Sequence, residues 1–130
     1  MREEKGVKIT ERGWPGHLMF ASSCGFRRNT LLEYKDKKWI VSTVGAYYSS
    51  DKKMDAIGYN RWYETMAFVG TEQDGYIDAD VYQQIDFDSE WGMWGESWDE
   101  ILEKYPHPDN HANDMHENVV LELMLRITEE

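Results

Sequence analysis

The hydrophobic pattern of this 130-residue chain changes period near residue 88, and this change constrains its fold more than any other feature. Before that point, apolar and β-branched residues alternate with polar ones in runs separated by turn residues, a pattern typical of strands. Beyond it, tryptophans and aliphatic residues recur at spacings of three and four, which is the helical period. The order predicts an α+β fold, with an antiparallel β meander of about five strands followed by two C-terminal helices packed on one face. We expect one domain over residues 1–130, strand-rich over 7–88 and helical over 89–130.

The strand-rich part contains runs that are separated by Gly, Pro, Asp, Ser and Lys turns. The expected strands are His17–Ala21, Phe26–Tyr34, Trp39–Tyr48, Asn60–Val69 and Tyr76–Phe87. The dipeptide Asp74-Gly75 predicts the hairpin turn before the last of these strands. In that strand the residues expected on the buried face are Ile77, Ala79, Val81, Ile85 and Phe87. The opposite, acidic face carries Asp78, Asp80, Gln84 and Asp86.

Helix start and stop signals divide the C-terminal part. Ser97, with Glu100 three residues later, is a capping-box pattern that predicts a short helix, and Pro106 ends it. We expect a loop over His107–Ala112 and a final helix capped by Asn113 or Asp114. One face of that helix is expected to carry His116, Val120, Leu123, Met124 and Ile127.

Composition excludes several classes of protein. A single cysteine, Cys24, excludes an internal disulfide framework and zinc fingers that need several Cys ligands. The longest run without Asp, Glu, Lys or Arg, Gly13–Phe26, has 14 residues and includes a Pro and a His, so we expect no membrane span. The N-terminus has no apolar segment typical of a secretory signal. These features predict a protein of a reducing, cytoplasmic compartment.

Charge is distributed unevenly along the chain. Residues 1–71 carry 12 Lys and Arg against 8 Asp and Glu, whereas residues 72–130 carry 2 against 17. One interpretation is that the opposite charges of the two halves attract each other within the fold and that the excess negative charge keeps the protein soluble. The other interpretation is that the two halves have different functions. The basic half would form a face that binds an anionic ligand, and the acidic half a face that repels or mimics nucleic acid. Direct DNA binding is not expected, because phosphate contacts need a basic surface.

Six strings of the chain are familiar in combination. They are Glu11–His17, Phe26–Leu31, Val41–Gly45, Tyr63–Met66, Asp78–Val81 and Met115–Glu117. Together they resemble a family of short, largely uncharacterised proteins encoded by bacteriophages and other mobile elements, over roughly residues 9–128. The resemblance implies a cytoplasmic setting in a bacterial host and carries no catalytic assignment. The Trp-rich stretch 91–98 and the loop 106–111 depart from the family pattern.

Two strands combine arginines with hydrogen-bonding and aromatic residues. Arg27, Arg28, Asn29 and Thr30 lie on the first, and Phe26, Arg28, Thr30 and Leu32 are expected to share one of its sides. Arg61, Tyr63 and Glu64 lie on the second. Guanidinium groups suit phosphate or carboxylate, an aromatic ring suits a base, and Glu64 suits a ribose hydroxyl. The alternative is that the arginines pair with the acidic half and that Glu64 pairs with Arg27 or Arg28.

We expect these strands to line one anion-binding pocket. The strand Trp39–Tyr48 between them would separate them by two strand spacings, about 10 Å. His17 and His116 complete the candidate ligand-binding set, although His116 also fits a hydrogen-bonded core histidine. The string His107–His116 contains three His and two Asp but lacks an established metal-ligand spacing, so we expect neither a metal nor a cofactor.

Three functional hypotheses follow. The first is a phage-type accessory protein that binds a small anionic or nucleotide-like ligand and serves as a sponge against host defence. The second is an acidic inhibitor that mimics nucleic acid and binds a host defence protein. The third is a small hydrolase using His17, Glu64 or His116. The six tryptophans also indicate a homo-oligomeric interface.

Overall fold

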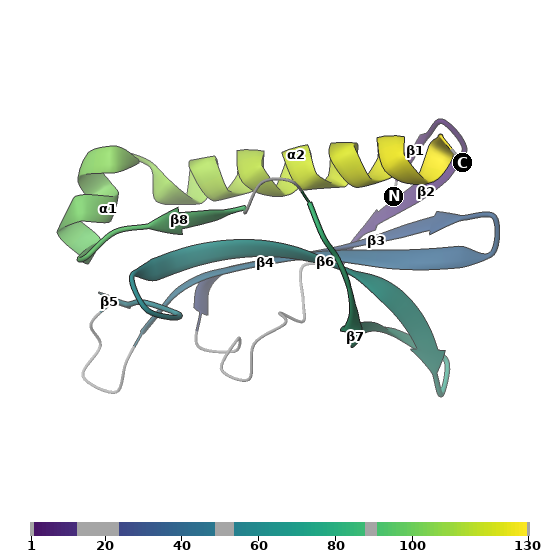
Figure 1. The fold of residues 1–130 in the computed structure, drawn as a ribbon, viewed down its shortest axis with the longest axis horizontal. Coiled ribbons are helices and arrows are strands. Elements are labelled where there is room, and N and C mark those ends of the chain that lie inside the picture. The colour runs from purple at the N-terminus through teal and green to yellow at the C-terminus, as the bar shows by residue number, and fades with distance from the viewer. Residues whose placement is uncertain (1, 13–23, 49–53, 88–90, 130) are drawn as a thin grey trace.

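The computed structural model describes residues 2–12, 24–48, 54–87 and 91–129. These residues form one antiparallel sheet of eight strands, with two helices at the C-terminal end of the chain (Figure 1). The strands are β1 (Arg2–Glu4), β2 (Val7–Glu11), β3 (Cys24–Tyr34), β4 (Lys37–Tyr48), β5 (Met54–Asp55), β6 (Arg61–Gln73), β7 (Tyr76–Ile85) and β8 (Gly92–Trp94). The helices are α1 (Trp98–Lys104) and α2 (Pro108–Thr128). The predicted α+β fold is therefore confirmed.

The sheet is a meander with two short additions. Its strands follow the order β1-β2-β3-β4-β6-β7, while β5 pairs with β4 and β8 pairs with β6. The expected count of about five strands is too low, because β1, β2, β5 and β8 were not among the expected strands. Strands β1, β5 and β8 have only three, two and three residues, too few to show alternation in sequence, whereas β2 has five. The expected strand His17–Ala21 lies outside the described residues.

Residues with positive φ shape two of the hairpin turns. Asp74 and Gly75 have φ values of 53° and 82° and join β6 to β7, as their dipeptide predicts. Lys35 and Asp36, with φ values of 49° and 67°, join β3 to β4 in the same way. Positive φ at both central residues matches the twist of the flanking strands.

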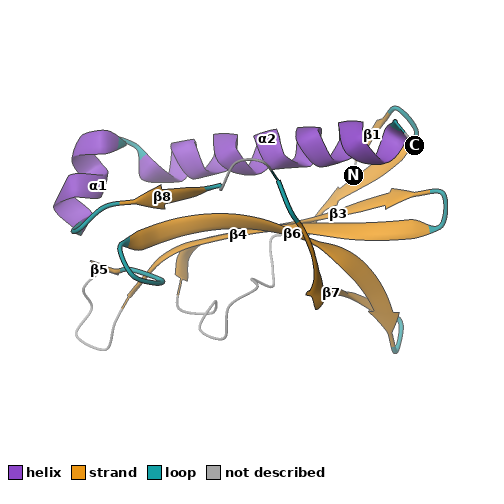
Figure 2. Cartoon of the chain, in the orientation of Figure 1, coloured by secondary structure: helices purple, strands orange, loops and turns teal. Residues whose placement is uncertain are grey.

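Helix α2 lies along one face of the sheet (Figures 1 and 2). Its buried residues are Ala112, Met115, His116, Val119, Val120, Leu123, Met124 and Ile127. Several of them pack on Val7, Leu32 and Val41 of the sheet, and each fully buried aliphatic side chain contributes roughly 1.5–3 kcal/mol. Helix α1 closes one end of this core, where Ile101 is fully buried. Neither helix of the described residues is long and apolar enough to cross a membrane.

Two expectations for the C-terminal part are wrong. Helix α2 begins at Pro108 with His107 as its N-cap, so the predicted loop over His107–Ala112 is helical. Proline suits the first helical position, where its missing N–H would have no partner, and Asp109 favours the first turn electrostatically. The segment around Trp94 forms β8 and pairs with β6, although its tryptophans have helical spacing. The predicted cap at Ser97 is confirmed, since its Oγ accepts from the Glu100 N–H at 3.2 Å.

Strand β7 does not alternate as expected. Phe68 pairs with Gln84 while Val69 pairs with Asp80, so residues 81–83 bulge out of the ladder. Val81 is consequently 59% exposed, whereas alternation placed it on the buried face. The Asp80 carboxylate holds the bulge by accepting from the Tyr82 N–H at 3.0 Å and from Gln83 Nε2 at 2.6 Å.

Candidate functional site

The sheet divides along one edge of β6. Arg61–Glu64 of β6 pairs with β8, and Ala67–Gln73 of the same edge pairs with β7. Between these pairings, the Thr65 N–H donates to the Trp91 carbonyl at 2.8 Å. The divergence of β7 and β8 leaves a cavity of about 380 Å³, which we call the fork pocket. Its polar and aromatic lining comes from Arg61, Glu64, Gln84, Asp86, Trp91 and Trp94.

An ion pair forms one wall of the fork pocket. Arg61 Nε lies 3.0 Å from Glu64 Oε2, and the two side chains are 39% and 9% exposed. Alternation predicted that these residues point to opposite sides of the strand. They meet because the pairing of β6 with β8 shifts register between Arg61 and Tyr63. Glu64 is therefore paired with an arginine, as one alternative predicted, but the partner is Arg61 rather than Arg27 or Arg28.

Two buried N–H groups of the fork pocket have no hydrogen-bond acceptor among the described residues. One is the indole N–H of Trp91. The other is the Nε–H of Arg61, which is close to Glu64 but does not align with it as a hydrogen bond. Buried donors without acceptors are costly, by about 1–3 kcal/mol each. Both nitrogen atoms are buried in the wall of the pocket rather than exposed on its surface.

Arg28 lies in a second polar cluster, between the sheet and α2. Its Nη2 lies 2.6 Å from Glu11 Oε2 and 2.8 Å from Glu117 Oε1. Arg2 completes the cluster at 2.9 Å from the other oxygen of Glu117. These residues and Thr30 line a cavity of about 210 Å³. We call Arg2, Glu11, Arg28 and Glu117 the Arg28 cluster.

The Arg28 cluster is electrostatically balanced. Burial alone would raise the pKa of Glu11, but hydrogen bonds from Arg28 and Thr30 outweigh it and hold that pKa below its ordinary value. Burial acts in the same direction on Glu117, and hydrogen bonds from Arg2 and Arg28 lower its pKa overall. The guanidinium of Arg28 is thus committed to two carboxylates, one of them from the acidic half of the chain.

His116 is fully buried, and both ring nitrogens are hydrogen-bonded. Nε2 lies 2.7 Å from Thr30 Oγ1, and Nδ1 lies 2.7 Å from Thr43 Oγ1. Thr43 Oγ1 is in turn 2.6 Å from Thr65 Oγ1. Burial, followed by the nearby charge of Arg28, lowers the pKa of His116 to about 4. The imidazole is therefore neutral near pH 7 and ties α2 to three strands.

The structure distributes the predicted site residues over several places. As expected, β4 separates β3 from β6, and Arg28 and Thr30 share the side that faces α2. The predicted residues of the two strands nevertheless line different cavities. Arg28 and Thr30 line the cavity of the Arg28 cluster, and Arg61 and Glu64 line the fork pocket.

The other predicted residues lie elsewhere. Asn29 is on the opposite face of β3, where its Oδ1 accepts from Arg12 Nε at 2.8 Å, and alternation places Arg27 with it. The Tyr63 hydroxyl donates to Asp109 Oδ1 at 2.8 Å beside a third cavity, of about 360 Å³. His17 lies outside the described residues.

Sequence reasoning missed several residues of these sites. Trp91, Trp94 and Gln84 line the fork pocket. The spacing of the tryptophans predicts a helix instead, and alternation places Gln84 on the acidic face of its strand. Thr43 was missed too, because no local pattern shows that it lies beside a buried imidazole. The described residues contain no group of three or more His, Cys, Asp or Glu side chains arranged to hold a metal ion.

Comparison with known proteins gives no relatives. The chain matches no protein-family model, no curated protein and no solved structure.

Proposed function

We propose that this protein binds a small nucleotide-like or anionic ligand in the fork pocket. The observation that carries the proposal is the lining of a cavity of about 380 Å³, which brings the Arg61–Glu64 ion pair together with the side chains of Trp91 and Trp94. Cavities of this size hold small ligands, and a few converging polar groups fix their orientation. The resemblance to phage and mobile-element proteins supports a role as a sponge for a defence signal in the bacterial cytoplasm.

The lining of the fork pocket suits a base and a sugar. Trp94, which is 38% exposed, and Trp91 offer aromatic faces for a base. Glu64 can accept a hydrogen bond from a ribose hydroxyl, and the partly exposed guanidinium of Arg61 can reach a phosphate. Glu64 and Asp86 offset the charge of Arg61, so the pocket favours a monophosphate over a polyphosphate.

Calorimetric titration with adenosine, AMP and GMP tests this proposal. Trp94→Ala removes a partly exposed aromatic face from the pocket, and should weaken binding by about 3- to 10-fold. Arg61→Gln should weaken AMP more than adenosine, because only AMP carries a phosphate. Trp98→Phe is the control, since Trp98 packs on Trp62 rather than in the fork pocket. A folded protein that binds none of these nucleotides at millimolar concentration would contradict the proposal.

A second candidate function is the acidic inhibitor. The β6–β7 hairpin extends away from the body of the sheet (Figure 1) and carries exposed Asp78 with exposed Tyr82. Carboxylates beside an exposed aromatic side chain fit the basic surface of a nucleic-acid enzyme. Asp80 holds the bulge, so the test uses Asp78→Asn with Asp86→Asn. Loss of nuclease inhibition at low salt in this folded variant would support the role, and unchanged inhibition would oppose it.

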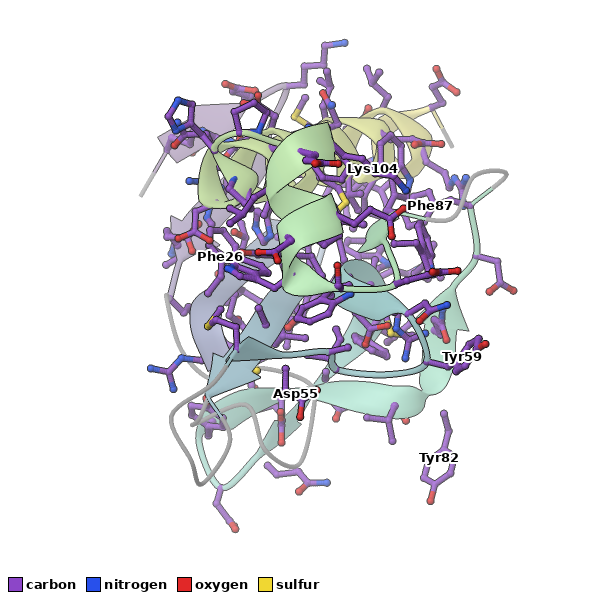
Figure 3. The ribbon with its side chains drawn as sticks, turned by 90° about the vertical axis from the view of Figure 1, so that its left-hand side faces the viewer. Phe26, Asp55, Tyr59, Tyr82, Phe87 and Lys104 are labelled. Carbon is purple, nitrogen blue, oxygen red and sulfur yellow. The ribbon has the colours of Figure 1, made fainter. Side chains whose placement is uncertain are left out.

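Self-association, which the six tryptophans indicate, is a separate proposal. Tyr59 and Tyr82 are 93% and 94% exposed, and both point away from the body of the protein (Figure 3). Large exposed aromatic side chains are enriched at interfaces between proteins. Light scattering at micromolar concentration tests this proposal, and Tyr59→Ser and Tyr82→Ser should shift a dimer towards the monomer.

A further inference from the structure

A separate cavity lies between the last turns of α2 and the sheet. Its volume is about 560 Å³, and we call it the C-terminal pocket. Its apolar lining comes from Trp39, Val69, Ile85, Leu123 and Ile127. These side chains belong to β4, β6, β7 and α2, so the helix and the sheet enclose it together. Apolar contacts dominate here, in contrast to the polar fork pocket.

A basic side chain lies at one rim of the C-terminal pocket. Lys37 and Lys38 both line it where β4 begins, but alternation places Lys37 on the face of Trp39 and α2, and Lys38 on the opposite face with Gly70. Within the described residues Lys37 makes no ion pair. Asp36 and Glu72 also line the pocket, so the positive charge there is modest. Lys37 can therefore accept an anionic group without breaking an existing pair.

Arg126 separates the C-terminal pocket from the fork pocket. Its Nη1 donates to the Asp86 carbonyl at 2.7 Å, and its guanidinium carbon lies 4.7 Å from the ring centre of Phe87. Figure 3 shows Phe87 next to the helical layer. Ile85 lines both cavities, but the stacked pair of Arg126 and Phe87 stands between their polar parts. Occupation of one cavity therefore does not require occupation of the other.

We propose that the C-terminal pocket binds a medium-chain fatty-acid anion. Its alkyl chain would lie between α2 and the sheet, on Trp39, Leu123 and Ile127, and its carboxylate would face Lys37. An aliphatic carboxylate fits an apolar interior with a cationic rim, and the cavity volume falls within the range of small-molecule sites. This proposal does not depend on the function proposed for the fork pocket.

Calorimetric titration with hexanoate, octanoate and decanoate, below their micelle concentrations, tests the apolar part. Each additional buried methylene should raise the affinity by about fourfold, the ratio that corresponds to its transfer free energy. Val69→Trp places a large ring in the cavity and should abolish binding, with circular dichroism to verify folding. Affinity that is independent of chain length would overturn the proposal.

The cationic rim needs its own variants. Lys37→Gln should weaken decanoate by about two- to fivefold, as expected for a partly exposed charge pair, and should leave decyltrimethylammonium unchanged or tighter. Lys35→Gln is the matched control, because Lys35 lies over the ring of Tyr34 outside the pocket. Equal loss in the control, or no loss in the Lys37 variant, would overturn the assignment of the carboxylate. AMP binding should be unaffected in every variant, which separates this site from the fork pocket.

Discussion

The Nε2 atom of His116 lies 2.7 Å from the hydroxyl of Thr30, and this contact sets the direction of a hydrogen-bond chain through the core. The same hydroxyl lies 2.7 Å from Glu11, whose lowered pKa makes it a carboxylate that can only accept. Thr30 therefore donates to Glu11 and accepts from the Nε2–H of His116. Nδ1 is then the bare nitrogen and accepts from the Thr43 hydroxyl. Thr65 donates to Thr43, so the chain runs in one direction from β6 to β2.

Stability should decrease with acid in a window set by His116. Its pKa is 6.5 in the unfolded chain and about 4 in the folded protein, so the unfolded chain binds the proton more tightly. The stabilisation is complete above pH 6.5 and declines as the pH falls towards 4, by at most about 1.4 kcal/mol per pH unit. Urea unfolding at pH 7, 6 and 5 measures this slope.

Variants separate His116 from the other titrating groups. His116→Gln should remove most of the slope between pH 6.5 and 5, whereas His111→Gln should retain it because His111 is exposed. Glu11 and Glu117 also favour folding at higher pH, but their ordinary pKa of 4.5 places their contribution at lower pH. A slope that persists in the His116 variant would assign the effect to other groups.

Thr43→Val should destabilise the protein by about 1–3 kcal/mol. Valine has nearly the same shape but cannot donate, so Nδ1 of the buried imidazole loses its partner. Thr71→Val is a suitable control, because Thr71 lies on β6 beyond the region that α2 covers and pairs with Asp78. Equal free energies of unfolding for the two variants would show that the hydrogen bond to Nδ1 contributes nothing.

Arg28→Ala should reduce stability and leave nucleotide affinity unchanged. The substitution leaves Glu11 and Glu117 without their shared guanidinium, and partial exposure limits the loss to about 1–2 kcal/mol. Arg61→Ala should also reduce stability, because Glu64 is only 9% exposed and loses its guanidinium, but it should weaken AMP binding as well. Chemical unfolding and calorimetry on both variants measure this contrast. If a folded Arg28→Ala protein bound AMP more weakly, Arg28 would have to be assigned to the nucleotide-binding site after all.

Local patterns predicted the long strands well. Alternation and turn chemistry located β3, β4 and β6 because both signals depend on neighbours in sequence. The Asp74-Gly75 turn followed from the need for positive φ at both residues. The bulge over residues 81–83 was not predictable, because its cause is the register that β6 imposes on β7.

The candidate sites depended on contacts that no short pattern records. Arg61 and Glu64 meet because β8 shifts register against β6, and β8 itself has only three residues. His116 has partners from β3 and β4, which lie 86 and 73 residues away in sequence. Residue types indicated which side chains carry chemistry, whereas the pairing of strands decided which of them meet.

Gly45→Ala should destabilise the protein by about 1–3 kcal/mol through overpacking. Gly45 pairs with Tyr63 across β4 and β6, and a Cβ at Gly45 would overlap the Tyr63 ring. That ring is 1% exposed and its hydroxyl donates to Asp109, so a shift of the ring would strain or break this hydrogen bond. Combining Gly45→Ala with Tyr63→Leu should cost less than the sum of the two single changes, because the second change removes the clash. Urea unfolding of the unsubstituted protein, the two single variants and the double variant measures the coupling free energy. Strictly additive losses would show that the Tyr63 ring does not require the absence of a side chain at Gly45.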